Sequence, residues 1–241
     1  MSSSGPTGEA PQLSSTYGQY DNGASVFTHY GGGGSTGWSQ FTFVGGTWST
    51  TNGYLQQTAT SGGYNGGPTA LIEGTSYPAT GNYILSMAFN YNTEADARVG
   101  IIAVATPTTA PDTFGYRFIG QQTDNAQGFI SFLNDLITWV VNNPYQGVVS
   151  TDYTMTITDA GGTWSGSLYS GYGETSSPLA TLAPTSYTAA NYAGSVSGYV
   201  GISAAYYSSS VLSNPINVMW FYMRAYPPNG VMPSVSFGSL G

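Results

Sequence analysis

The sequence predicts an all-β protein, a sandwich or barrel of short antiparallel strands. Short runs rich in Val, Ile, Phe, Tyr, Trp and Thr recur along most of the chain, and these residue types favour strands. Gly, Asn and Pro separate the runs at a spacing of roughly ten residues, which is typical of all-β sandwiches and barrels. The chain is 241 residues long and 40% hydrophobic, so it can bury the core of one large domain.

The chain begins with a segment that predicts no strand. Residues 1–15 (MSSSGPTGEAPQLSS) hold turn formers and almost no apolar pattern, so we expect a flexible or assembly tail there. The remaining residues, 16–241, are expected to form a single domain. Its clearest strands are predicted over 41–44, 83–91, 98–105, 116–120, 152–158, 197–207 and 217–226.

Two sequence patterns predict turns between these strands. Asn52-Gly53 precedes YLQQTAT, and this dipeptide predicts a type I′ hairpin turn. The segment GGTWS occurs at Gly45–Ser49 and again at Gly161–Ser165. In both copies we expect the glycines to supply positive φ angles and the Trp to anchor the following strand. A duplicated half-domain is the alternative explanation of this repeat.

The segment Gly128–Asn143 fits two structures. Phe129, Leu133 and Leu136 recur there at helical spacing. The same residues also form two predicted strands joined at Asn134-Asp135. Enrichment in Ile, Val, Phe and Trp favours this hairpin.

The scarcity of charge excludes several functions. The chain has 3 Arg, no Lys, 11 Asp plus Glu, 1 His and no Cys. It therefore has no P-loop or Schiff-base lysine, no thiol nucleophile and no disulfide. A net charge of −8 argues against a nucleic-acid partner, because such binding depends on clustered Lys and Arg. No run of about 20 apolar residues predicts a membrane span, and no cofactor is implied.

Glu94 and Asp96, in TEADAR, are the best catalytic candidates. At i and i+2 on a strand they share one face, near the separation of roughly 5 Å that a retaining glycosidase needs. The alternative is a solvated turn in which Arg98 pairs locally with these carboxylates. His29 lies in VFTHYGGGG with no nucleophile motif elsewhere, so we expect a structural role for it.

Several oxygen-bearing side chains are of the types that bind calcium. They are Asp124, Asn125, Asn134, Asp135 and Asp152. No closely spaced D-x-D-x-D loop holds them together, so the sequence does not predict a metal site.

The aromatic residues are candidates for binding carbohydrate. Sugars present apolar C–H faces ringed by hydroxyl groups, so their receptors combine flat aromatic rings with Asn, Asp and Gln. The candidate rings are Trp38, Trp48, Tyr54, Trp139 and Trp164. The alternative is that these bulky, strand-favouring side chains fill the core, as we expect for Trp220 in its apolar run.

The order and character of the strands resemble those of a known superfamily. From WSTTNGYLQQTA through NYILSMAFNY, RVGIIAVA, FGYRFIGQQTDNAQGFISFLND, DYTMTITDAGGTWSGSLY and GYVGISA to MWFYMRAYPP, the chain is similar to the concanavalin A-like lectin/glucanase superfamily. Within it, the chain resembles laminin-G-type modules of archaeal and bacterial surface proteins. The resemblance covers Phe41 to Ser239 and implies a jelly-roll sandwich of two antiparallel sheets. TEADARV partly resembles the E-x-D-x-x-E strand of jelly-roll glucanases, but Val99 replaces the last Glu, so the acid–base residue is absent.

Three functions remain open at this point. The first is a non-catalytic extracellular or cell-surface module that binds glycans or mediates adhesion. The second is a structural subunit of an extracellular filament, sheath or virion that self-assembles through its N-terminal tail. The third is a glycoside hydrolase of the jelly-roll glucanase type, whose catalytic motif is incomplete.

The scarcity of charge also predicts tolerance of acid. Full protonation moves the side-chain charge only from −8 to +4, because the cations are 3 Arg and 1 His. Acid unfolding proceeds largely by protonating carboxylates that the native state needs ionised, and this chain has few of them. We expect a fold that survives strong acid, as a microbial surface in an acidic setting requires.

Overall fold

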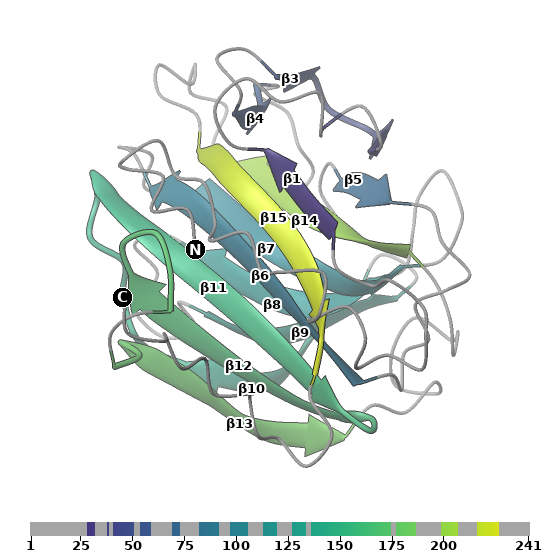
Figure 1. Cartoon of the computed structure of the whole chain (residues 1–241), viewed down its shortest axis with the longest axis vertical. Coiled ribbons are helices and arrows are strands. Elements are labelled where there is room, and N and C mark those ends of the chain that lie inside the picture. The colour runs from purple at the N-terminus through teal and green to yellow at the C-terminus, as the bar shows by residue number, and fades with distance from the viewer. Residues whose placement is uncertain are drawn as a thin grey trace, which may run out of the picture.

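In a computed structural model, the chain folds into two antiparallel sheets that lie face to face (Figure 1). The structure describes residues 28–31, 38, 41–50, 54–58, 69–72, 82–91, 97–105, 113–119, 127–133, 136–174, 177–186, 199–206 and 216–226. The predicted all-β sandwich of two antiparallel sheets is confirmed. The predicted tail, 1–15, lies outside the described residues.

Among the described residues, one sheet has eight strands. Seven of them follow the order β13 (Ala180–Ser186), β12 (Thr163–Ser170), β11 (Thr151–Ala160), β6 (Asn82–Tyr91), β15 (Asn217–Ala225), β4 (Leu55–Gln57) and β3 (Trp48–Ser49). The eighth, β1 (Thr28–Gly31), pairs with β15.

The other sheet has seven strands within the described part of the chain. Their order is β10 (Leu136–Asn143), β9 (Gln127–Leu133), β8 (Thr113–Ile119), β7 (Ala97–Ala105), β14 (Tyr199–Tyr206), β5 (Thr69–Ile72) and β2 (Thr42–Val44). The strands β7 to β10 form a meander here, and β11 to β13 form one in the eight-stranded sheet. The chain then returns through β14 to pair with β7 and through β15 to pair with β6.

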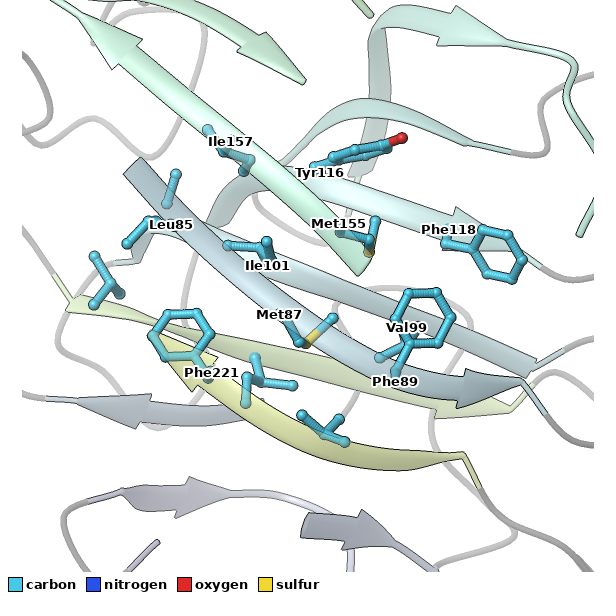
Figure 2. Packing of buried hydrophobic residues seen from close by; sticks show 14 of the residues in the cluster. Leu85, Met87, Phe89, Val99, Ile101, Tyr116, Phe118, Met155, Ile157 and Phe221 are labelled. Atoms are coloured by element: carbon cyan, nitrogen blue, oxygen red, sulfur yellow. The ribbon is translucent and has the colours of Figure 1, made fainter. Parts of the chain in front are cut away.

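The core lies between the sheets. Figure 2 shows Leu85, Met87 and Phe89 of β6 in one cluster with Val99 and Ile101 of β7. All five side chains are 1% exposed or less. Successive side chains of a strand point to opposite faces, so the residues between these positions face outward from the sandwich.

The ambiguous segment is a hairpin. β9 pairs with β10, and Leu133 lies opposite Leu136. The helical alternative is wrong, because β9 also pairs with β8, so the sheet binds the backbone of this segment on two sides. The turn residues, Asn134-Asp135, lie outside the described residues.

The two GGTWS segments share their turn chemistry and differ in their connections. Gly45 and Gly46 both have φ of 69°, and Gly161 and Gly162 have φ of 64° and 89°. The second pair is the two-residue turn between β11 and β12. The first pair carries the chain from β2 in one sheet to β3 in the other, which argues against a duplicated half-domain. β3 pairs with β4 as the Asn52-Gly53 signal predicts, although those two residues lie outside the described ranges.

Two of the three arginines are buried on the outer face of the seven-stranded sheet. Arg117 of β8 stands in register between Gly100 of β7 and Gly128 of β9. A Cβ on Gly100 would lie 2.5 Å from the Tyr116 carbonyl oxygen, so no side chain can occupy the position beside this arginine. Arg98 and Arg117 are 5% and 4% exposed. The carboxylates expected to pair with Arg98 lie outside the described residues.

Candidate functional site

A row of polar side chains crosses the outer face of the eight-stranded sheet. Each member is next in sequence to a side chain packed into the core, so strand alternation turns it outward. Strand register then places the five members side by side on five neighbouring strands. The polar row consists of Asp152 (β11), Asn90 (β6), Asn217 (β15), Gln56 (β4) and Ser49 (β3). All five residues are half-buried.

Hydrogen bonds between neighbouring members orient the polar row. The Asn90 Nδ2 donates to Asp152 Oδ1 at 2.6 Å, and the Gln56 Nε2 donates to Asn217 Oδ1. A primary amide carries two N–H donors and one carbonyl acceptor. One bond of this kind therefore positions each side chain and leaves it the capacity to bind a ligand.

Two tyrosines flank the polar row. Tyr54 and Tyr172 are half-buried and pack on an apolar cluster formed by Ala88, Met219 and Trp220. A register shift between Val218 and Trp220 is a β-bulge, which breaks the alternation of β15. As a result, Trp220 packs beneath the tyrosines on the outer face of the sheet. The expectation that Trp220 is a buried core residue is confirmed, since it is 1% exposed and belongs to this second core cluster.

The loop after β12 holds Tyr172 in place. The Thr154 hydroxyl donates to the Gly171 carbonyl at 2.8 Å and accepts from the Gly173 N–H at 2.7 Å. Burial raises the pKa of Tyr172 above its ordinary value, and its hydrogen bond to the Asp152 carboxylate adds to this effect. The loop therefore joins an aromatic ring to the Asp152 end of the polar row.

An aromatic pair stands at the opposite end. Phe43 stacks on Trp48 with ring centroids 5.5 Å apart and an interplanar angle of 20°. The Trp48 indole N–H donates to the Gly45 carbonyl at 2.9 Å, which fixes the ring against the turn. β2 and β3, which carry the two rings, are the last strands of their respective sheets. The pair therefore lies at an edge of the sandwich, next to Ser49.

The described carboxylates are Asp152, Asp159 and Glu174, and they do not form a glycosidase pair. Glu174 Oε1 accepts from the Ser86 and Thr156 hydroxyls at 2.8 and 3.1 Å. Thr156 lies four residues along β11 from Asp152, a distance of roughly 13 Å, whereas paired glycosidase carboxylates are about 5 to 9.5 Å apart. Asp159 is fully buried and faces the core.

The candidate aromatic residues have different environments. Trp38 and Trp164 are buried, at 2% and 0% exposure, so they have the packing role that was the alternative to ligand binding. Tyr54 is half-buried beside the polar row, and Trp48 is half-buried at the edge of the sandwich, where it packs against the main core. The side chain of Trp139 lies outside the described residues.

The remaining candidates cannot be placed at a site. Glu94, Asp96, Asp124, Asn125, Asn134 and Asp135 lie outside the described residues, as does the side chain of His29. Asp152 belongs to the polar row. Within the described ranges, no group of three or more His, Cys, Asp or Glu is placed to hold a metal ion. No helix in the described part of the chain is long and apolar enough to cross a membrane.

Most of the polar row has no distinguishing signal in the sequence. Asn90 and Asn217 each lie at the end of a predicted strand, and an outward polar residue at such a position is an ordinary feature of a half-exposed sheet. Their significance comes from the register that aligns them with Asp152 and Gln56. Tyr172 and Phe43 carried no motif that distinguishes them from other aromatic residues.

Several solved structures share this arrangement of strands at low sequence identity. Peanut lectin with a 9mer peptide matches with a TM-score of 0.54 and 15% identity, over 83% of this chain and 97% of the lectin. The carbohydrate binding module CBM66 from Bacillus subtilis matches with a TM-score of 0.53 and 11% identity, over 77% of this chain and 96% of the module. The chain has the concanavalin A-like fold. The resemblance noted from the order of the strands is confirmed at the level of the fold.

A third solved structure contains a similar fold as one part of a longer protein. The GH43 protein BlXynB from Bacillus licheniformis matches with a TM-score of 0.52 and 12% identity, over 75% of this chain and 35% of that protein. The similarity therefore concerns one part of BlXynB. No protein-family model matches the sequence, and comparison with curated proteins gives no match.

Proposed function

We propose that this concanavalin A-like chain is a non-catalytic carbohydrate-binding module that acts at a cell surface or outside the cell. The glycan binds on the outer face of the eight-stranded sheet, along the polar row and against Tyr54 and Tyr172. The observation that carries the proposal is the alignment of three amides, a carboxylate and a hydroxyl beside two partly exposed tyrosine rings.

The chemistry of this surface suits a sugar. Amides and carboxylates make paired hydrogen bonds to neighbouring hydroxyl groups, and tyrosine rings offer apolar faces to C–H groups with little loss of conformational entropy. Bonds within the polar row hold the side chains before a ligand arrives, and such preorganisation lowers the entropic cost of binding. The lectin and the carbohydrate binding module of the same fold support this assignment by analogy.

Calorimetry against a panel of soluble polysaccharides tests the proposal. We expect saturable binding by the whole chain. The Asn90→Ala variant should bind about 10-fold more weakly, because a 10-fold change in affinity corresponds roughly to the binding free energy of one hydrogen bond. The matched control is Asn142→Ala, which removes an exposed amide from β10 in the other sheet and should leave affinity unchanged. Failure of every polysaccharide to bind would refute the proposal, as would equal losses in the two variants.

Sugar release tests the non-catalytic part of the proposal. Incubation of the chain with the polysaccharides that it binds should give no reducing ends above the buffer control. Release that persists after purification would instead support a hydrolase. Glu94→Gln would then show whether the predicted nucleophile takes part.

A further inference from the structure

We propose that the ligand is an uncharged, extended polysaccharide that crosses the strands along the polar row and ends on the Phe43–Trp48 pair at the edge of the sandwich. This inference rests on the function proposed above and adds the direction, length and charge of the ligand.

The shape of the polar row indicates an extended chain. Its five members occupy five neighbouring strands, and strands lie about 4.8 Å apart, so the row is roughly 19 Å long. Its donors and acceptors repeat at each strand rather than converging on one point. Such a surface offers each consecutive sugar unit of an extended chain a polar contact, whereas a single terminal sugar would use only one part of it.

The aromatic pair lies at the edge of the sandwich, beyond the last member of the polar row. Ser49 directly follows Trp48 on β3, so Trp48 lies on the core side of the sheet, where it packs against the main core cluster. A sugar chain that passes Ser49 on the outer face therefore turns over the edge of the sandwich to reach the exposed ring of Phe43. Phe43 is 41% exposed and Trp48 is half-buried. The bond from the Trp48 indole to Gly45 and the stacking of Phe43 hold both rings in place. A ring fixed at the edge can pack against the face of one further sugar unit.

The charges indicate that the ligand is neutral. Two carboxylates, Asp152 and Glu174, lie on this face. The two described arginine side chains, Arg98 and Arg117, are buried on the other sheet. With a net charge of −8, the protein repels polyanions at low ionic strength. Uronic acid polymers and sulfated glycans are therefore disfavoured.

Calorimetry with oligosaccharides of two to six units tests the length and direction of the ligand. Gluco-, manno- and xylo-oligosaccharides serve as the neutral probes. For the series that binds, affinity should rise with length, and Phe43→Ala should weaken the longest oligomers by about 10-fold while leaving the dimer unchanged. The matched control is Leu179→Ala, which removes a side chain of 40% exposure next to β13, the opposite end strand of the eight-stranded sheet.

The alternative results separate this inference from the proposed function. Binding that does not depend on length, or a Phe43→Ala loss that is equal at all lengths, overturns the extended chain and leaves a glycan-binding module. Oligogalacturonides of matched length should bind at least 10-fold more weakly than the neutral series at low salt, and tighter binding overturns the neutral ligand. If no sugar of any kind binds, both the proposed function and this inference fail.

Discussion

Asp159 should make the protein more stable in mild acid than at neutral pH. This residue is 0% exposed and stands in register between Tyr83 of β6 and Trp164 of β12. Its Oδ1 accepts a 2.6 Å bond from the Gly162 N–H. Its Oδ2 has no hydrogen-bond partner among the described residues. Burial raises the pKa of this carboxyl from 3.8 to about 7, against the smaller opposing effect of the Gly162 bond.

The sign follows from proton binding. Between pH 7 and pH 4 the folded state holds a proton on Asp159 that the unfolded state has released, so stability rises as the pH falls through this window. A pKa shift of this size would raise the free energy of unfolding by about 4 kcal/mol between pH 7 and pH 4 if it acted in full. Solvent screening near the turn reduces the expected gain to about 2 kcal/mol.

The Asp159→Asn variant tests this reasoning, because asparagine resembles the protonated acid and keeps an oxygen for the Gly162 N–H. The melting temperature of the variant at pH 7.5 should exceed that of the wild type by roughly 4–8 °C. The difference should disappear near pH 4. Asp152→Asn is the matched control, since Asp152 lies half-exposed on the outer face and should give no such gain. A variant that is no more stable than the wild type at pH 7.5 would refute the reasoning.

Three further predictions concern the fold. Trp164 is fully buried and packs edge-on against Tyr83 and Phe114. Chemical denaturation of Trp164→Ala should therefore show a free energy of unfolding about 3–5 kcal/mol below that of the wild type. A smaller loss than that caused by Phe43→Ala, which removes an exposed ring, would contradict the packing. Gly161 has φ of 64°, and a Cβ added to it would meet nothing within 4 Å. Gly161→Ala should therefore lower the free energy of unfolding by only about 1–2 kcal/mol in the same experiment, because the left-handed backbone conformation alone disfavours alanine. The wild-type chain should keep its far-UV circular dichroism spectrum to pH 3, since it has few ion pairs to lose, and cooperative unfolding above that pH would count against the expected acid tolerance.

Much of the fold could be predicted because its signals are local. Seven strands were expected from runs of β-favouring residues, and all seven are present with boundaries shifted by a few residues. The strands β1, β5 and β13 were not expected. β1 and β5 have four residues each, too few to show a period, and β13 contains Pro184, a residue type that argues against a strand. The prediction of a self-assembling tail stays open, because residues 1–15 lie outside the described part of the chain.

The candidate site could be predicted only in part. The sequence named Trp38, Trp48, Tyr54 and Trp164 alike as candidate ligand-binding rings. In the structure Tyr54 lies beside the polar row, Trp48 lies at the edge of the sandwich, and Trp38 and Trp164 are buried. A tryptophan in a strand is compatible with either face, and its neighbours in space decide which. The bulge in β15, which moves Trp220 to the outer face, has no signature in the sequence that precedes it.

The sequence by itself determined the strand-forming character, the turn chemistry and the scarcity of charge of this protein, because each depends on residue types or on neighbours along the chain. Only the tertiary structure decided which polar groups act together. Asn90 reaches Asp152 across 62 residues, and Gln56 reaches Asn217 across 161 residues. Register between distant strands follows from how the whole core packs, so the polar row exists only once both sheets have formed.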